Sequence, residues 1–489
     1  MASNSRVARA YKACVALLFF IAIAVSSDAQ TFTNLFTFEG TNGEYPLAPL
    51  VQGRDGNLYG TSAGDGISDG GTVFKITTKG ALTTLHSFEG TDGFRPYAGL
   101  VQAADGNLYG TTYNGGTSSN GTAFKITPTN RLTVLHSFCQ TDCTDGANPV
   151  PGLTQGRDGA FYGTTMNGGA GYGTVFKMTR RGKVTTLHIF DGTDGAYPES
   201  GLVQTPDGNF YGTTYGGGGG LNCFKPGCGT VFKVTPVGKF TTLYVFCEQS
   251  YCPDGSQPVG TLVQGSDGEF YGTTSTGGLS YDTLCDGGCG TVFKITSLGK
   301  LTTLYRFCTR SGCTDGTLPT GNLVQATNGN FYGTTLVGGG SYNCDSYGPG
   351  CGSVFEITPA GQLTTLHSFG NGDAGSPWAG LVQDTDGSFY GTTTGGTVTL
   401  GTVFSIAVGL HPFTQMLPTW GDVGTAVEIL GTRLKGATGV RFNQTAAVFT
   451  VVSNTEIKTT VPTGATTGFV TVTTPGGTLK SNKKFRVIR

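Results

Sequence analysis

Short apolar segments alternate with glycine-rich turns along most of the chain, and the same pattern returns at a regular interval. One copy runs over residues 99–138 and contains four segments rich in β-branched and aromatic residues. Gly, Asn, Asp and Pro separate these segments, which predicts short β-strands joined by turns. The four predicted strands are 99–102, 107–112, 121–127 and 132–138.

The second segment of each copy contains Tyr-Gly-Thr, and this motif marks seven copies. A period of 49 to 61 residues predicts a propeller, a solenoid or another repeat array. Four antiparallel strands in each copy favour a β-propeller with one small sheet per blade. The seven motif tyrosines are Tyr59, Tyr109, Tyr162, Tyr211, Tyr271, Tyr332 and Tyr390.

The two ends of the repeated region favour a closed ring over an open stack. The last copy stops after its third segment, 401–407, whereas an additional fourth-type segment, 32–38, precedes the first copy. Pairing between these two segments would remove an exposed sheet edge, while an open solenoid would need polar caps. The sequence therefore predicts an all-β protein in which residues 30–409 form a seven-bladed β-propeller closed by the N-terminal strand.

The first 29 residues have a different character. A basic start with Arg6 and Arg9 leads into an apolar run over 13–25, and Ser27-Asp28-Ala29 supplies small residues before Gln30. This order predicts a secretory signal peptide over 1–29, with an apolar run too short for a comfortable membrane span. We expect a chain without a transmembrane segment that is secreted, extracellular, cell-surface or periplasmic.

From about residue 410 the repeat ends and glycine becomes less frequent. Alternating short segments at 427–431, 440–442, 451–457 and 470–477 predict a small β-sandwich over 410–489. The order and spacing of these segments resemble an IPT/TIG domain, and this resemblance implies an immunoglobulin-like fold.

The repeats carry a resemblance of their own. Their Asp-Gly-Asn-apolar-Tyr-Gly-Thr core, as at 105–111, is similar to sensor-type propeller repeats. From residue 31 to about 408 the chain resembles the bacterial "GloVer" tandem-repeat proteins. That resemblance implies surface or extracellular placement and adds no mechanism.

Composition and charge narrow the possible partners. Glycine supplies 83 of 489 residues, and charged residues make up 12%, about half the usual ~25%. The net charge is -1, which gives no electrostatic support for binding nucleic acid or acidic membranes. We expect no nucleic-acid partner and a monomeric protein.

Twelve cysteines remain once Cys14 of the predicted signal peptide is set aside, and they form six close pairs. An even number in an exported chain predicts disulfides, each worth about 2 kcal/mol at best because the loops are small. Zinc is the alternative, and it would need two pairs to converge in space. The predicted disulfides are Cys139–Cys143, Cys223–Cys228, Cys247–Cys252, Cys285–Cys289, Cys308–Cys313 and Cys344–Cys351.

All six pairs fall in loops that follow a second or a fourth strand, and these loops emerge on one face of an up-and-down propeller. Long insertions at 221–228, 280–289 and 341–351 lie on the same face. Rigid loops with aromatic and polar groups are typical of recognition surfaces, although disulfides can also serve only to resist proteolysis. The candidate binding residues are Phe224, Lys225, Tyr251, Tyr281, Asp286, Tyr342, Asp345, Tyr347 and Trp378.

Three repeated polar positions have structural explanations. The fourth-strand histidines share a register with Tyr244, Tyr305 and Phe36, so a planar ring for packing explains them better than metal binding. Seven first-strand glutamines either satisfy backbone groups near turns or form a ligand site on the axis. Asp-Gly pairs after the fourth strands indicate turns more than calcium sites, which need six to eight oxygens. The histidines are His86, His136, His188 and His367.

No catalytic constellation is recognisable. The chain lacks Ser-His-Asp, HExxH and phosphate-binding patterns, and Asp282, Asp286 and Asp345 are the loop carboxylates outside the repeat. We predict no catalytic residues, no cofactor and no bound metal. The sequence favours a secreted or cell-surface binding protein that recognises an extracellular protein or glycan through the disulfide-rich loop face. There are two alternatives. One is a carbohydrate-active enzyme (a glycoside hydrolase or lyase) that uses loop carboxylates on that face, and the other is a purely structural envelope protein.

Overall fold

The computed structural model describes residues 30–64, 66, 69–219, 223, 227–278, 285, 287–340, 350–370, 373–395 and 400–488. Regular structure in these residues consists of β-strands and one 3-10 turn, η1 (Ser311–Cys313). None of the helical structure in this part of the chain is long and apolar enough to cross a membrane. The predicted signal peptide, residues 1–29, lies outside the described residues.

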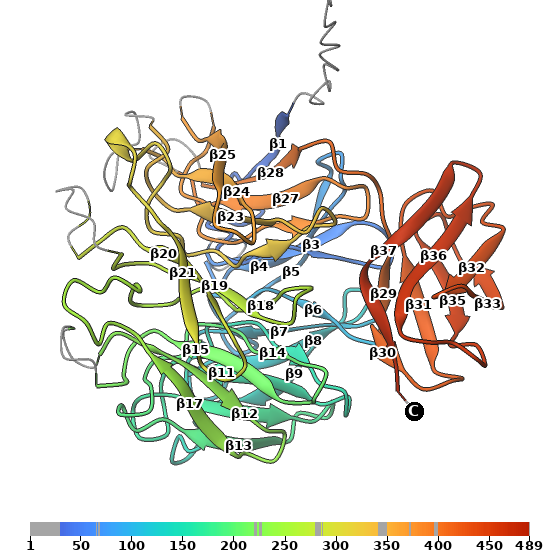
Figure 1. Cartoon of the computed structure of the whole chain (residues 1–489). Coiled ribbons are helices and arrows are strands. Elements are labelled where there is room, and N and C mark those ends of the chain that lie inside the picture. The colour runs from blue at the N-terminus through green and yellow to red at the C-terminus, as the bar shows by residue number, and fades with distance from the viewer. Residues whose placement is uncertain are drawn as a thin grey trace, which may run out of the picture.

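Strands β1–β28 form seven four-stranded antiparallel sheets in a blade-like arrangement (Figure 1), which we number blades 1 to 7 by their first strands. The first strands have two residues each: β2 (Val51–Gln52), β6 (Val101–Gln102), β10 (Thr154–Gln155), β14 (Val203–Gln204), β18 (Val263–Gln264), β22 (Val324–Gln325) and β26 (Val382–Gln383). The second strands carry the Tyr-Gly-Thr motif: β3 (Leu58–Ser62), β7 (Leu108–Thr112), β11 (Phe161–Thr165), β15 (Phe210–Thr214), β19 (Phe270–Thr274), β23 (Phe331–Thr335) and β27 (Phe389–Thr393).

The outer half of each blade consists of a third and a fourth strand. The third strands are β4 (Thr72–Ile76), β8 (Thr122–Ile126), β12 (Thr174–Met178), β16 (Thr230–Val234), β20 (Thr291–Ile295), β24 (Ser353–Ile357) and β28 (Thr402–Ala407). The fourth strands are β5 (Leu82–Ser87), β9 (Leu132–Ser137), β13 (Val184–Ile189), β17 (Phe240–Val245), β21 (Leu301–Arg306), β25 (Leu363–Ser368) and, in blade 7, β1 (Thr31–Thr37).

The N-terminal strand completes the last blade. Strand β1 pairs antiparallel with β28, and Thr31 lies opposite Ala407 in this register. Phe38 follows β1 and packs edge to face against Phe74 of blade 1, with 5.4 Å between ring centroids. The two ends of the repeated region therefore pair as the sequence predicts.

The glycine of Tyr-Gly-Thr is required by the packing inside each blade. In blade 2, a Cβ atom at Gly110 would lie 2.6 Å from Cζ of Phe124 and 2.9 Å from Leu100. The Phe124 ring is fully buried on this glycine. Because interiors are close-packed, a side chain at Gly110 would displace the ring that forms the core of the blade.

The tyrosine of the same motif joins neighbouring blades. The Tyr109 ring packs against Phe161 of blade 3, with 4.1 Å between centroids, while its hydroxyl donates to Asp105 at 2.8 Å. Phe138 packs against Phe176 of blade 3 at 5.1 Å. Aromatic pairs at these distances stabilise beyond the area that they bury. The motif thus builds the blade and its contact with the next blade.

The C-terminal strands form two further sheets, drawn in orange to red at one side of the repeats (Figure 1). The sheet orders are β29-β31-β35-β34 and β30-β37-β36-β32-β33. Apolar side chains of both sheets, including Ile429 and Val472, form a shared core, as expected for a sandwich. The strands are β29 (Gln415–Leu417), β30 (Trp420–Gly421), β31 (Ala426–Leu430), β32 (Gly439–Phe442), β33 (Thr445–Ala447), β34 (Phe449–Val451), β35 (Glu456–Thr460), β36 (Gly468–Thr474) and β37 (Gly477–Val487).

The sandwich packs against the turns that join first and second strands, and we call this side of the ring the turn face. Arg54 Nε lies 2.5 Å from Glu428 Oε2, and the Thr455 hydroxyl donates to the Arg54 carbonyl at 2.9 Å. The Arg157 guanidinium lies over the Trp420 ring, 5.1 Å from its centroid. The opposite side, where the loops after second and fourth strands emerge, is called the loop face below.

Candidate functional site

A cavity with a volume of about 580 Å³ lies where the seven blades meet. Every blade contributes residues that immediately precede its first strand, such as Gly99 and Leu100 before β6. Tyr113 and Met166, which follow the second strands β7 and β11, also line it. First strands begin and second strands end on the loop face, so this axial pocket lies on that face.

One register of the repeat supplies the most variable part of the axial pocket. Each copy has a proline shortly before its first strand, and the residue after this proline lines the pocket. The proline is the same in all seven copies, whereas six different residue types occupy the next position. The blades therefore do not depend on any particular side chain there. These residues are Leu47, Tyr97, Val150, Glu199, Val259, Thr320 and Trp378.

Glu199 supplies the only charged side chain among the residues that line the axial pocket. Burial raises the pKa of its carboxyl from the usual 4.5 to about 7. No hydrogen bond or ion pair involves this carboxyl group within the described part of the chain. A carboxylate in such surroundings is destabilised until a ligand or a proton neutralises it.

Aromatic rings lie near this carboxylate. The rings of Tyr97 and Tyr113 are 5.1 Å apart between centroids. Burial raises the pKa of the Tyr113 hydroxyl, the nearby Tyr97 and Glu199 raise it further, and Arg95, which does not line the pocket, lowers it. Burial and the charge of Glu199 likewise raise the pKa of Tyr215. Glu199 therefore shares its surroundings with several tyrosine hydroxyls.

Several polar groups of the axial pocket wall are already paired. The backbone N–H of Thr261 donates to Asn322 Oδ1 at 2.6 Å, and the Thr261 hydroxyl oxygen accepts from the N–H of Gly201 at 2.8 Å. The Thr320 hydroxyl donates to the carbonyl of Trp378 at 3.1 Å. These bonds fix part of the pocket wall, and among the described residues that line it Glu199 is the one charged group, without an ion pair.

Five of the six predicted disulfides are present, all in loops of the loop face. They are Cys139–Cys143, Cys223–Cys228, Cys247–Cys252, Cys285–Cys289 and Cys308–Cys313. Cys344 lies outside the described residues, so the Cys344–Cys351 pair stays a prediction.

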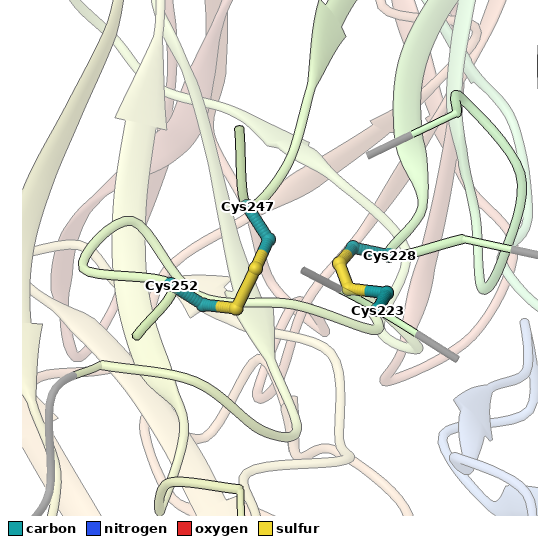
Figure 2. Close-up of side chains that lie close together, drawn as sticks. All are labelled: Cys223, Cys228, Cys247 and Cys252. Carbon is teal, nitrogen blue, oxygen red and sulfur yellow. A yellow bond between two sulfur atoms is a disulfide. The ribbon is translucent and has the colours of Figure 1, made fainter. Parts of the chain in front are cut away.

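Two of these pairs converge in blade 4, as the zinc alternative requires. The sulfur atoms of Cys223, Cys228, Cys247 and Cys252 all lie within 4.8 Å of one another (Figure 2). In blade 5, Cys285, Cys289 and Cys308 do the same. Sulfur atoms joined in disulfides are not thiolates, so the paired state offers no zinc ligands.

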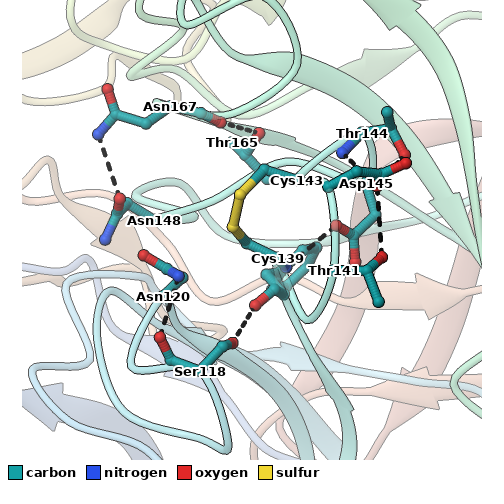
Figure 3. Close-up of a disulfide and its surroundings, with 12 residues drawn as sticks. Ser118, Asn120, Cys139, Thr141, Cys143, Thr144, Asp145, Asn148, Thr165 and Asn167 are labelled. Atoms are coloured by element: carbon teal, nitrogen blue, oxygen red, sulfur yellow. Dashed lines mark hydrogen bonds between the residues drawn. A yellow bond between two sulfur atoms is a disulfide. The ribbon is translucent and has the colours of Figure 1, made fainter.

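The Cys139–Cys143 disulfide shows that one pair is sufficient for such a loop (Figure 3). The neighbouring loop contains Ser118 and Asn120 in place of cysteines, and the Ser118 hydroxyl donates to the carbonyl of Phe138. Asp145 accepts from the N–H of Cys139 at 3.0 Å. The loop is held by a local disulfide and local hydrogen bonds, with no need for a second pair.

The repeats match a known protein family. The family model described as the Gloeobacter/Verrucomicrobia repeat matches residues 21–153, 140–348 and 226–442, which is most of the chain. The chain belongs to the Gloeobacter/Verrucomicrobia repeat family. The IPT/TIG domain model matches residues 413–487, which include the two C-terminal sheets. Gloeobacter/Verrucomicrobia repeats joined to an IPT/TIG domain indicate an interaction or structural protein.

Solved structures show the fold alone. A fungal alcohol oxidase of the AA5 family, solved in complex with copper, is 13% identical with a TM-score of 0.53, and the match covers 94% of this chain and 99% of that chain. A putative 6-phosphogluconolactonase from Bacteroides uniformis is 17% identical with a TM-score of 0.45, covering 68% of this chain and 88% of its own. A search of curated protein sequences finds no match.

Within the Gloeobacter/Verrucomicrobia repeat, the fourth-strand rings have a partner that the sequence interpretation missed. Each histidine or tyrosine hydrogen-bonds to the aspartate of the following loop, at 2.6 to 3.0 Å. Where the ring is Phe36, the loop carries Asn42 in place of the aspartate. The position is structural, as predicted, but it holds a loop as well as packing. The pairs are His86–Asp92, His136–Asp145, His188–Asp194, Tyr244–Asp254, Tyr305–Asp315 and His367–Asp373.

The glutamines of the Gloeobacter/Verrucomicrobia repeat satisfy backbone groups and bridge neighbouring blades. Gln325 Oε1 accepts from the N–H of Ser266 in blade 5 at 2.9 Å, while its Nε2 donates to the Gly329 carbonyl of its own turn at 3.0 Å. The bond from the N–H of Thr385 to Gln52 Oε1, at 3.3 Å, joins blade 7 to blade 1. These contacts support the backbone interpretation over a ligand site.

Two of the nine candidate binding residues lie in the described part of this Gloeobacter/Verrucomicrobia repeat chain. Trp378 lines the axial pocket and is 40% exposed, whereas Tyr251 is 73% exposed on its loop and does not line the pocket. Glu199, Tyr97 and Tyr113 were missed, although the variable position after each repeated proline was a visible signal for Glu199 and Tyr97. The candidates outside the described residues are Phe224, Lys225, Tyr281, Asp286, Tyr342, Asp345 and Tyr347.

Proposed function

We propose that the chain is a secreted or cell-surface binding protein that recognises an extracellular protein or glycan on the loop face, with the axial pocket as the site. The observation that carries the proposal is the register after the repeated proline. It differs from blade to blade, lines one cavity and includes the unpaired carboxylate of Glu199. The predicted disulfide-rich loops emerge on the same face.

The size of the axial pocket suits a compact ligand. Its volume of about 580 Å³ falls in the range typical of sites that enclose a small molecule. Tyr97, Tyr113 and Trp378 provide aromatic surface in its wall. Such a cavity fits a small molecule or the end of a larger ligand.

Binding is favoured over glycoside hydrolysis by the number of carboxylates. Most glycosidases use two carboxyl groups about 5–10 Å apart. Glu199 is the only carboxylate that lines the axial pocket in the described part of the chain. Asp282, Asp286 and Asp345, the carboxylates of the enzymatic alternative, lie outside the described residues.

A glycan array and an extracellular-protein array, probed with the full chain and matched variants, test the proposal. We expect a Tyr113→Ala/Trp378→Ala double variant to lose at least about tenfold in affinity for any ligand found, because the aromatic wall is removed. The control is Tyr251→Ala, which removes an exposed ring of the same face outside the pocket. Its affinity should stay within about twofold.

Three results would contradict the proposal. Equal affinities of the double variant and Tyr251→Ala would move the site away from the axial pocket. Turnover of a polysaccharide, abolished by Asp286→Asn or Asp345→Asn, would favour the enzymatic alternative. Loss of cell association on removal of residues 410–489, together with an absence of ligands on both arrays, would favour the structural alternative.

A further inference from the structure

The carboxylate of Glu199 forms no ion pair within the described part of the chain. Lys, Arg and His are absent among the residues that line the axial pocket, and no described residue hydrogen-bonds to this carboxylate. The repeat does not require it, since the same register holds Leu47, Val150 and Val259 in other blades. A half-buried acid without a structural partner is costly to retain, so its partner is expected to be a ligand.

The surroundings of Glu199 favour an organic cation over a metal ion. Calcium needs six to eight oxygen ligands, and one carboxylate with largely apolar neighbours cannot supply them. The side-chain oxygen of Asn322 already accepts from the N–H of Thr261 at 2.6 Å. Tyrosine faces, by contrast, attract an ammonium group, and Tyr97 and Tyr113 lie in the same pocket.

The volume of the axial pocket favours a cation carried on a ring over one on a flexible chain. About 580 Å³ is more than a single lysine side chain fills, and sites of this size normally enclose most of a small molecule. Sugar rings present apolar faces that can pack on Tyr97, Tyr113 and Trp378. These aromatic side chains come from blades 2 and 7, and Glu199 comes from blade 4.

We propose that the axial pocket binds an amino sugar at the end of a glycan, with the sugar ammonium paired to the carboxylate of Glu199. The inference rests on the proposed function in taking this pocket as the binding site. The tyrosine rings then contact both the sugar ring and its charge, and an N-acetylated sugar of the same shape lacks the ion pair.

Calorimetric titration of the full chain with two matched probes tests the inference. The β-1,4-linked tetramer of glucosamine carries ammonium groups, and the tetramer of N-acetylglucosamine has the same rings without charge. We expect the charged tetramer to bind at least about tenfold more tightly. Glu199→Gln should remove this preference while Tyr113→Leu weakens both probes, because the first change removes only the charge.

The charge-matched control is Glu248→Gln, which removes an exposed carboxylate of the same face outside the pocket. It should change the affinity for the charged tetramer by less than about twofold. Thermal melting of each variant verifies that it is folded. A lysine-containing pentapeptide serves as the third probe. If this peptide binds as tightly as the charged tetramer, the pocket recognises a protein ligand and the amino-sugar inference is wrong.

The remaining outcomes separate this inference from the proposed function. If both tetramers bind equally and Tyr113→Leu weakens both, the pocket binds glycans and the charge inference is wrong. Absence of binding by either tetramer also overturns the amino-sugar inference, whereas array ligands that depend on Tyr113 would still support the proposed function. Glycan binding that survives both Glu199→Gln and Tyr113→Leu would overturn the proposed function as well.

Discussion

The two faces of the ring differ in what the repeat holds constant. On the turn face, Asp-Gly turns recur in most copies, glutamines such as Gln325 bridge adjacent blades, and the sandwich contacts Arg54 and Arg157. On the loop face, the position after the repeated proline changes from Leu47 to Glu199, and loop lengths and cysteines vary. The repeat therefore builds the ring through one set of positions and leaves another set free to diverge.

The constant positions have partners inside the fold, whereas the distinctive variable one does not. Tyr109 has its ring against Phe161 and its hydroxyl on Asp105. Glu199 has neither an ion pair nor a hydrogen bond among the described residues. Under the proposed function, stability and binding depend on different positions of the repeat, and variants can test this division directly.

The largest effect is expected at a constant core position. Phe124→Ala should lower the free energy of unfolding by about 3–5 kcal/mol, because the fully buried ring fills the space above Gly110. Tyr113→Ala, at a variable position of the same blade, should cost less than about 1 kcal/mol. Denaturant unfolding of both variants gives the comparison, and equal losses would contradict the division.

The next-largest effect depends on pH, and here the substitution raises the free energy of unfolding, whereas Phe124→Ala lowers it. The pKa of Glu199 is raised from 4.5 to about 7, so the folded chain loses stability as pH increases through this interval. Glu199→Gln removes this loss and should stabilise the fold by up to about 3 kcal/mol at pH 8, less where pocket water solvates the carboxylate. At pH 4 the variant and the parent should be equally stable. A stability difference that does not change between pH 4 and pH 8 would show that Glu199 is not buried as a charge.

A disulfide of the loop face should contribute less than a core ring. Cys139→Ser/Cys143→Ser should lower the free energy of unfolding by about 2 kcal/mol, the chain-entropy value for so short a loop. Reductant should lower the free energy of unfolding of the parent more than that of the variant, because the variant has no Cys139–Cys143 bond to lose. If the variant does not fold at all, the loops of the loop face are required for folding and the expected modest effect is wrong.

The smallest effect separates two glutamines of the turn face. Gln325→Ala should cost about 1–1.5 kcal/mol, since Gln325 accepts a hydrogen bond from Ser266 of the adjacent blade. Gln264→Ala should cost about 0.5 kcal/mol, because the corresponding neighbour is Pro206, which has no N–H. Thermal or denaturant unfolding measures both. The same loss in both variants would mean that the bridge between blades contributes nothing.

The fold could be predicted well because its signals are local and repeated. Seven Tyr-Gly-Thr copies define seven second strands, and the isolated segment 32–38 identified the strand that completes the last blade. The Cys spacing also identified the five disulfides in the described residues. Each of these predictions depends on residues close in sequence or on a pattern that appears several times.

The axial pocket could not be located in the same way. Its wall combines single residues from seven blades, and Tyr97 lies about a hundred positions before Glu199. Sequence reasoning gave more weight to the long insertions, where aromatic residues such as Tyr281 and Tyr347 stand out. Which loop residues turn toward the axis depends on how the blades pack. The pairing of His86 with Asp92 was missed for a related reason, since strand pairing and loop path bring these side chains together.

The pairing of β1 with β28 also determines when the last blade can be completed during synthesis and folding. During synthesis, β1 is the first strand of the ring to be made, but its partner is complete only when Ala407 has been added. Until β1 pairs with it, β28 is the edge of an unfinished sheet, and closing so long a separation is entropically slow. An interrupted chain keeps a free strand at its beginning, and a full-length neighbour with an open edge can accept that strand. Assembly errors in this protein should therefore take the form of strand exchange between copies at a single seam.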